Sequence, residues 1–373
     1  MAVEPAYPAR EVKLRFLERK CFGCGICAEF MEVFMRIILD VMGADKPAAE
    51  LVRGAVLAKN EYQTETVLVG NERIIREALA ALEVPAGEFE IVHSDDVITM
   101  EDSPMSVFQT HKDCSMAKTL KLVAEGKGDA AVSAGNTGAY FTGATLIVRR
   151  IHGIRRAALG TILPFASPLM MLDCGANVTV TPDYLAQFAC LGSVYMEKVC
   201  GVKQPRVGLV NNGSEEHKGT PLYIETYHLL KEMKGIHFVG NVEGKDFPYG
   251  KCDVLVCDGF TGNIILKTSE GLCRFLMEKV QEMFRSGMIS MLSGALVHGK
   301  AKEMKRFFDA REYGGAPFLG LARPVIKAHG SSDADAIKNA IRQAASYAEA
   351  GVIEEIERRA ADFKVPAGSA GHE

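Results

Sequence analysis

A small set of lysine, aspartate and histidine side chains in this sequence lies within glycine-rich segments. Lys218 lies in NGSEEHKG, Asp258 opens DGFTGN, and His329 opens HGSS. A lysine ammonium, glycine N–H groups and neutral polar side chains together suit an anion, because they offset its charge and satisfy its oxygen atoms. The pattern therefore predicts a site for phosphate or for a ligand that carries phosphate.

The other candidates for this anion site come from short segments of the same kind. They are asparagine, threonine, serine and glycine residues that can donate hydrogen bonds, together with one further lysine. The candidates are Asn136, Thr137, Gly138, Asn177, Gly259, Thr261, Gly262, Asn263, Lys327, Ser331 and Ser332. Any one of these segments can equally be an ordinary strand-to-helix turn, which uses the same residue types.

The elements that must position these residues alternate along the chain from Met35 onward. A short run rich in Val, Ile and Leu is followed by a polar, Gly-containing cluster and then by a longer helix-like segment. That order predicts an α/β fold with a mostly parallel sheet. The expected strands are 36–40, 66–70, 90–94, 129–133, 169–173, 207–211, 236–240, 253–257 and 324–328.

Six polar clusters follow these strands. In chain order they are VMGAD, AGNTGA, CGAN, NGSEEHKG, DGFTGN and HGSS. In open α/β sheets, ligands bind outside the carboxyl ends of the strands. The six clusters together predict one shared polar cleft.

Length and composition limit the class of protein. The chain has 373 residues, is 48% hydrophobic and has a formal net charge of -4. It is long enough to bury a full core, and its charge gives no overall attraction to nucleic acid. No uncharged apolar run reaches the roughly 20 residues of a membrane span, and the charged N-terminus is unlike a secretory peptide. We expect a cytoplasmic protein whose scattered cysteines are reduced.

An amphipathic helical segment is expected over 272–312, where apolar residues recur with a period near 3.6. Its stretch SGMISMLSGALVHG has no Asp, Glu, Lys or Arg. Such a stripe usually forms core or a subunit interface, and the sharper hypothesis is a helical hairpin that contacts a membrane surface or an acyl chain. The residues in question are Met288, Ile289, Met291, Leu292 and Leu296.

Seven segments, in order, resemble the bacterial acyl-ACP:phosphate acyltransferase family of phospholipid synthesis. They are ILDVMGAD, SAGNTGA, LDCGANV, EEHKG, NVEGKDFPYGKCDVLVCDGFTGNIILKTSEG, GAPFLGL and KAHGSSDA, spread over 35–351. The resemblance implies a Rossmann-like three-layer α/β/α fold, related to phosphotransacetylase and the isocitrate dehydrogenase group, with a protruding amphipathic segment. It also implies a homodimer at the membrane periphery that uses no cofactor.

The implied reaction moves an acyl group from acyl-carrier protein to inorganic phosphate, giving acyl phosphate. Lys218 and Asp258 lie at matching motif positions. Our hypothesis gives Lys218 the contact with phosphate or with the developing oxyanion, and has Asp258 orient that lysine or the phosphate proton. His329 either protonates the departing thiol or is a structural histidine at a strand end.

Acyl-carrier protein is acidic, so its docking surface should be locally basic. The candidate patch lies in VRRIHGIRRAAL, and a solvated helix end is the competing interpretation. The patch consists of Arg149, Arg150, Arg155 and Arg156. A membrane glycerol-3-phosphate acyltransferase would receive the product, which places the protein at the inner face of the cell membrane.

Other classes of protein remain open at this point. A phosphotransacetylase that uses coenzyme A is the nearest rival, although the long apolar stripe favours a long acyl chain. A dehydrogenase is disfavoured because no dinucleotide fingerprint follows a strand. The non-enzymatic alternatives are a membrane-bound scaffold and an iron–sulfur carrier.

The iron–sulfur alternative depends on CFGCGIC, where Cys21, Cys24 and Cys27 begin a ferredoxin-like run. Met31 and Glu32 fill the positions of its fourth cysteine and of the proline. Because the family-like sequence begins at Met35, our hypothesis is that 1–34 is an upstream extension, with translation normally starting at Met35. A genuine extension with redox-sensitive thiols is the alternative. At the other end, we expect 352–373 to be a helix end and a disordered tail.

Overall fold

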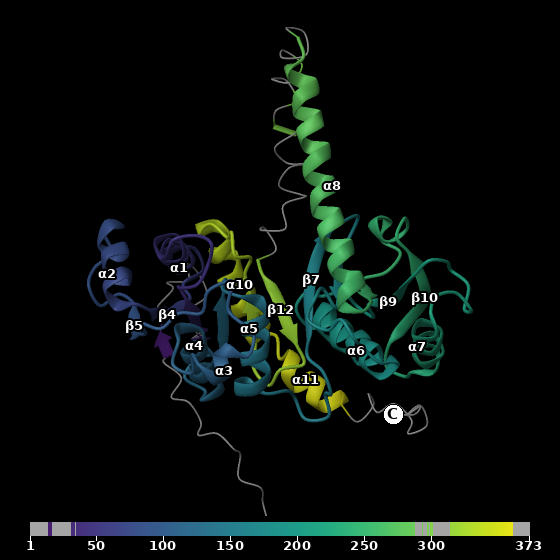
Figure 1. The fold of residues 1–373 in the computed structure, drawn as a ribbon, viewed down its shortest axis with the longest axis horizontal. Helices are drawn as coiled ribbons and strands as arrows, with labels where there is room; N and C mark the ends of the chain where they lie inside the picture. The colour runs from purple at the N-terminus through teal and green to yellow at the C-terminus, as the bar shows by residue number, and fades with distance from the viewer. Residues whose placement is uncertain are drawn as a thin grey trace, which may run out of the picture. The chain divides into compact units, whose positions relative to one another are not determined.

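The computed structural model describes residues 14–16, 31–33, 35–287, 293, 297, 299–300 and 314–360. The chain divides into two compact units (Figure 1). Unit 1 is Met1–Val148 with Ala328–Glu349, and unit 2 is Arg149–Lys327 with Ala350–Glu373. Each unit contains strands and helices of its own, and each is taken separately below.

Unit 1 contains four parallel strands in the order β6-β3-β4-β5. Ile38 of the central strand lies opposite Val67 on one side and Ala131 on the other, and all three side chains are buried. A strand that is buried on both faces has a continuous run of apolar residues in the sequence, and such runs predicted these strands. The strands are β3 (Arg36–Asp40), β4 (Glu65–Gly70), β5 (Glu90–His93) and β6 (Ala130–Ser133).

Helices cover both faces of the unit 1 strands (Figure 1). One group is α1 (Ala48–Tyr62), α2 (Glu72–Ala81) and α10 (Ala334–Glu349), and the other is α3 (Ser106–Gln109), α4 (Ser115–Ala124), α5 (Thr137–Gly143) and the π-helix η1 (Ala144–Val148). Helices α1 and α10 pack closely, since a Cβ at Gly54 would lie 2.6 Å from Ile337 Cβ. The arrangement follows from right-handed crossovers between parallel strands.

Unit 2 contains seven strands in the order β10-β9-β11-β8-β7-β12-β13. The first four are mutually parallel, and the pairs β8–β7, β7–β12 and β12–β13 are antiparallel. The strands are β7 (Ala158–Pro164), β8 (Pro168–Leu172), β9 (Arg206–Asn211), β10 (His237–Glu243), β11 (Val254–Val256), β12 (Ala316–Leu319) and β13 (Val325–Lys327). The helices are α6 (Pro182–Lys198), α7 (Pro221–Glu232), the 3-10 helix η2 (Phe247–Tyr249), α8 (Gly259–Arg285) and α11 (Val352–Arg359).

All nine strands expected from the sequence form, and the α/β class with a mostly parallel sheet is confirmed. In the large sheet the sequence interpretation missed β7 and β12, each of which is antiparallel to both of its neighbours, and it also missed the short pair β1–β2 (Leu14–Phe16 and Met31–Val33). β7 runs into β8 through a connection of only three residues, 165–167. No helix separates these two strands, so the strand–turn–helix rhythm did not reveal β7.

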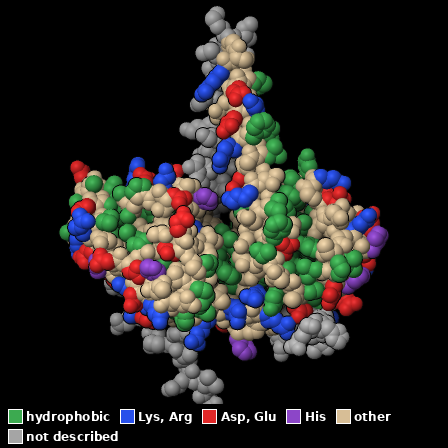
Figure 2. All heavy atoms as spheres, viewed as in Figure 1, with side chains coloured by type: hydrophobic (Ala, Val, Ile, Leu, Met, Phe, Trp, Pro, Cys, Tyr) green, Lys and Arg blue, Asp and Glu red, His purple; other side chains and the backbone are tan. Residues whose placement is uncertain are grey.

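Helix α8 begins earlier than expected. It starts at Gly259, not at Leu272, because Asp258 caps it and nothing in the following residues breaks it. Leu272, Phe275, Leu276 and Met283 are 51–58% exposed, so the described part of the stripe is not core of this chain. Figure 1 shows α8 extending beyond the strands of its own unit, and Figure 2 shows hydrophobic side chains along its surface.

Several residues singled out in the sequence lie outside the described part of the chain. They are Met288, Ile289, Met291, Leu292 and Leu296 of the apolar stretch, and Cys21, Cys24 and Cys27 of CFGCGIC. Near the N-terminus, β1 (Leu14–Phe16) and β2 (Met31–Val33) form an antiparallel pair. Among the described residues, no helix is both long and apolar enough to cross a membrane.

Candidate functional site

Three of the six polar clusters come together in unit 1: VMGAD, AGNTGA and HGSS. The N–H of Asp45 donates to the carbonyl oxygen of Gly330 at 3.0 Å. A Cβ at Gly135 would lie 3.7 Å from the carbonyl oxygen of Gly43, so the first two loops also lie side by side. These clusters follow β3, β6 and β13.

Asn136 caps helix α5 and anchors a neighbouring loop. Its Oδ1 accepts the N–H of Ala139 at 3.0 Å. Its Nδ2 lies 3.0–3.2 Å from the carbonyl oxygens of Thr99, Met100 and Asp102. The side-chain amide is therefore committed to protein partners, which differs from the free donor that the sequence suggested. The N–H groups of Thr137 and Gly138 have no hydrogen bond to the residues that the structure describes.

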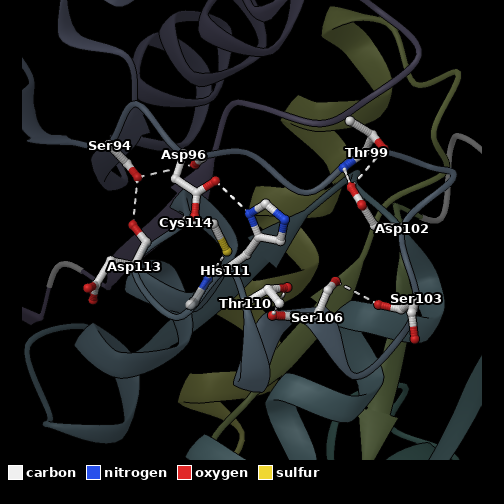
Figure 3. A network of polar contacts seen from close by, with 11 residues as sticks. Ser94, Asp96, Thr99, Asp102, Ser103, Ser106, Thr110, His111, Asp113 and Cys114 are labelled. Atoms are coloured by element: carbon white, nitrogen blue, oxygen red, sulfur yellow. Dashed lines mark hydrogen bonds and ion pairs between the residues drawn. The ribbon is translucent and has the colours of Figure 1, made fainter.

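The loop that Asn136 anchors was missed in the sequence (Figure 3). In this loop, His111 Nδ1 lies 2.6 Å from Asp96 Oδ1, and Asp102 Oδ2 accepts the N–H and the hydroxyl of Thr99, each at 2.7 Å. Hydrogen bonds from the Thr99 backbone and side chain lower the pKa of Asp102. The available signal was the length of the polar stretch between β5 and α4, since long ordered loops are often functional.

The HGSS cluster forms a compact turn at the start of the chain's return to unit 1. His329 Nδ1 lies 2.8 Å from Ser331 Oγ and accepts the Ser331 N–H at 3.2 Å. The N–H of Ser332 donates to the His329 carbonyl oxygen at 3.0 Å, and the Ser332 side chain is buried. In a neutral imidazole this arrangement places the ring proton on Nε2.

In unit 2, CGAN and DGFTGN come together around the fully buried carboxylate of Asp173, which accepts five N–H groups. NGSEEHKG is linked to them through Tyr223, which adjoins Gly219 and donates to Asp258. Two of the five N–H groups on Asp173 belong to Asn177, whose backbone N–H and Nδ2 lie 2.7 and 2.6 Å from Asp173 Oδ2. Asn177 Nδ2 also donates to the Ala157 carbonyl oxygen at 2.8 Å. Asn177 therefore holds the loop together, and Asp173 is a structural residue that the sequence interpretation missed although it ends an apolar strand.

The N-terminus of α8 is closed by bonds within the protein. The N–H of Gly259 donates to the Asn177 carbonyl oxygen at 2.8 Å. The N–H of Thr261 donates to Asp258 Oδ1 at 2.9 Å, and that of Gly262 donates to the Asp258 carbonyl oxygen at 2.9 Å. These three amides already have acceptors, so they differ from the open anion cradle expected of DGFTGN.

The Asp258 carboxylate is held by hydroxyl groups as well. Its Oδ2 accepts from the Tyr223 hydroxyl at 2.6 Å and from the Thr261 hydroxyl at 2.7 Å. Burial acts to raise the pKa of Asp258, but hydrogen bonds from Tyr223 and Thr261 outweigh it and leave the pKa below its ordinary value. Asp258 is therefore ionised at neutral pH.

Lys218 lies in the exposed loop between β9 and α7. Asn211 Nδ2 donates to the Lys218 carbonyl oxygen at 3.0 Å, and the Lys218 N–H donates to the Glu215 carbonyl oxygen at 3.1 Å. Within the described ranges its ammonium makes no hydrogen bond or ion pair, whereas Lys231 pairs with Glu216 at 2.7 Å. Lys218 thus has a fixed backbone and an exposed ammonium that can bind an anion.

The remaining candidates of unit 2 are Asn263 and Lys327. Asn263 is exposed on α8, and a Cβ at Gly175 would lie 3.7 Å from its Cβ. Lys327 is buried in β13. Three of the six clusters thus belong to each unit, and a single cleft shared by all six stays a prediction.

The arginine patch lies in the loop between η1 and β7, and all four side chains are exposed. Arg155 pairs with Asp183 at 2.6 Å, and the guanidinium of Arg156 lies 5.5 Å from the ring centre of Tyr184. Arg149 and Arg150 have no side-chain partner among the residues with described positions. They are the more available half of the patch.

Known proteins resemble this chain over most of its length. The model of the fatty acid synthesis protein family matches residues 35–355. The phosphate acyltransferase of Clostridium botulinum (strain Loch Maree / Type A3) is 44% identical over 325 residues, covering 87% of this chain and 97% of that protein. The phosphate acyltransferase of Clostridioides difficile (strain 630) is 41% identical over 324 residues, covering 86% of this chain and 95% of that protein.

Solved structures share the fold at low sequence identity. A phosphotransacetylase from Streptococcus pyogenes has a TM-score of 0.59 at 17% identity, covering 84% of this chain and 94% of that chain. A 4-hydroxythreonine-4-phosphate dehydrogenase from Klebsiella pneumoniae has a TM-score of 0.51 at 12% identity, covering 84% of this chain and 100% of that chain. At such identities these likenesses concern the fold alone.

Proposed function

We propose that this protein makes acyl phosphate from acyl-carrier-protein thioester and inorganic phosphate. The chain belongs to the fatty acid synthesis protein family, and relatives at 41–44% identity are named phosphate acyltransferase. At the coarser level, the chain is an acyltransferase of the phosphate acyltransferase kind, in fatty acid and phospholipid synthesis. The observation that carries the finer proposal is the exposed Lys218, an unpaired cation among the described residues, on a loop that adjoins Tyr223, whose hydroxyl donates to the ionised Asp258.

The reaction needs no strong base. A phosphate oxygen attacks the thioester carbonyl carbon, a C–O bond forms, and the C–S bond breaks as the thiolate leaves and takes up a proton. Phosphate, with a second pKa of about 6 to 7, is already anionic at neutral pH, and a thiolate of pKa about 8.5 is a tolerable leaving group. Positioning and stabilisation of negative charge should therefore dominate catalysis.

In this proposal Lys218 stabilises the phosphate or the developing oxyanion. Asp258, held ionised by Tyr223 and Thr261, orients that lysine or accepts the phosphate proton in a hydrogen bond, and it does not act as an acid. His329 is the candidate that protonates the departing thiolate. Its hydrogen bonds to Ser331 fit equally the alternative that it is a structural histidine at the end of a strand.

A purified chain should release free thiol from acyl-ACP only when inorganic phosphate is present. The expected result is a phosphate-saturable rate, with acyl phosphate formed in proportion to thiol. Acyl-CoA is the comparison substrate, and a hydroxamate trap distinguishes acyl phosphate from free fatty acid. A rate independent of phosphate would contradict acyl phosphate formation, and a preference for acyl-CoA would replace the carrier protein as donor.

The arginine patch supports docking of an acidic carrier protein. Reversing charge at Arg149 and Arg150 should raise the apparent KM for acyl-ACP several-fold and weaken its dependence on salt, because exposed charges act through a field that ions screen. The control is Arg73→Glu with Arg76→Glu on α2, which changes net charge equally at another surface. An equal rise in KM in both double variants would remove this patch as the docking surface.

The exposed apolar face of α8 supports the expected assembly. Leu272, Phe275, Leu276 and Met283 are all more than half exposed on one helix. Burial of such side chains is favourable, so we infer that a second copy of the chain, a membrane surface or both cover this helix and the stretch beyond it. A homodimer at the inner face of the membrane could then pass acyl phosphate to a membrane glycerol-3-phosphate acyltransferase.

A further inference from the structure

Tyr223 lies between the two residues to which the proposed reaction gives its main charges. We propose that Tyr223 is a positioning residue of this site, which fixes the Asp258 carboxylate and ties to it the backbone that carries Lys218. The inference rests on the proposed function and deepens it, since it assigns a role to a side chain that the sequence interpretation did not single out.

The first contact fixes Asp258 at two points. The Tyr223 hydroxyl donates to Asp258 Oδ2 at 2.6 Å, and the backbone N–H of Asp258 donates back to the same hydroxyl oxygen at 3.3 Å. One phenol oxygen therefore holds both the side chain and the backbone of Asp258. The two residues are 35 positions apart in the chain, so this bond joins α7 to the start of α8.

The second consequence concerns the direction from which Asp258 can be approached. The hydroxyls of Tyr223 and Thr261 both donate to Oδ2, and Oδ1 accepts the Thr261 N–H at 2.9 Å. A carboxylate oxygen has two lone pairs, so the phenol takes up one of the two acceptor sites on Oδ2. It thereby restricts where an added donor, such as a lysine ammonium or a protonated phosphate oxygen, can approach Asp258.

The third contact links Tyr223 to Lys218. Tyr223 lies in the first turn of α7, and its N–H donates to the Thr220 carbonyl oxygen at 2.9 Å. Gly219 has a φ of 97°, and a Cβ there would lie 3.1 Å from Tyr223 Cβ and 2.8 Å from Asn211 Oδ1. Because Asn211 also binds the Lys218 carbonyl, the backbone at 218–219 is held between the end of β9 and Tyr223.

The phenol itself is suited to this role and not to proton transfer. Burial, followed by the hydrogen bond to Asp258, raises the pKa of Tyr223 well above its ordinary value. The hydroxyl therefore stays protonated at neutral pH and remains a constant donor to Asp258.

The test is Tyr223→Phe, which removes the hydroxyl and keeps the ring and the Cβ that lies beside Gly219. The expected result is a fall of about 10-fold or more in kcat/KM for phosphate, because a hydrogen bond to a charged group is lost. The acid limb of the pH–rate profile should also move to higher pH. This hydrogen bond lowers the pKa of Asp258, so its removal raises that pKa, and Asp258 is protonated at a higher pH than before.

The matched control is Tyr227→Phe, one turn further along α7. Its hydroxyl bonds Glu216, which pairs with Lys231 and has no role in the proposed reaction, and its ring packs edge-on against Phe238. This variant should keep both the rate and the pH profile of the unmodified enzyme. The melting temperatures of both variants show whether either loses its fold.

The possible outcomes separate the inference from the function on which it rests. An unmodified enzyme without phosphate-dependent acyl transfer defeats the proposed function and this inference together. An active enzyme whose Tyr223→Phe variant keeps its rate defeats the inference alone. A slower variant with an unmoved acid limb also overturns it, since a merely structural tyrosine would lower the rate without changing the titration of Asp258.

Discussion

Lys218→Ala should lower kcat/KM for phosphate by about 10²–10³-fold, the range found when one donor to a developing negative charge is removed. Lys218 has an exposed ammonium without a hydrogen bond or ion pair to the described residues, on a backbone fixed by Asn211 and Glu215. Its removal breaks no side-chain hydrogen bond or ion pair with the described part of the chain, so stability should change little while the rate collapses. Steady-state kinetics with varied phosphate, beside a thermal melt, measures both.

Two further variants make this result specific. Lys203→Ala removes an exposed lysine just before β9, at the opposite end of the strand from Lys218, and should leave kinetics unchanged. Lys218→Arg keeps the charge but changes its shape from a compact ammonium to a planar fork, so we expect only partial recovery of the rate. Full activity in a folded Lys218→Ala enzyme would exclude this lysine from the reaction.

The fold was predictable from the sequence where local pattern and final environment agree. Strands such as β3 and β6 have apolar centres because helices cover both of their faces, and each is followed by a glycine-containing turn and a helix. β7 broke the pattern because it returns directly to β8 as an antiparallel neighbour. Nothing in the periodicity of seven apolar-rich residues distinguishes such a strand from a piece of loop or helix.

The candidate site was predictable by residue type and less so by role. Asn136 and Asn177 were identified as polar residues at strand ends, yet their amides hold loops together. The reason is that a side chain that caps a helix and one that binds an anion require the same chemical groups. Tyr223 could not be found at all, because its importance arises from a hydrogen bond to a residue 35 positions away.

The strongest structural constraint on the site concerns Gly262, in the first turn of α8. A Cβ at this position would lie 1.9 Å from the carbonyl oxygen of Asp173 and 2.9 Å from Cys257 Sγ. The Asp173 backbone cannot move away easily, because the carboxylate of the same residue is bound by five N–H groups. A methyl group at Gly262 must therefore displace the start of the helix, and with it Asp258.

Gly262→Ala should thus destabilise the protein by at least the roughly 1–3 kcal/mol typical of overpacked sites, and it should also reduce activity. The comparison is Gly271→Ala in the same helix, where a Cβ would meet nothing within 4 Å. Alanine at that exposed position should stabilise the helix by about 0.5–1 kcal/mol, because glycine loses more backbone entropy on folding. Urea denaturation of both variants measures the two free energies of unfolding. We expect the free energy of unfolding to fall in Gly262→Ala and to rise in Gly271→Ala. Changes of opposite sign within one helix would show that the close approach to Asp173, and not helix propensity, determines the residue at 262. Equal stability of the two variants would refute the close contact.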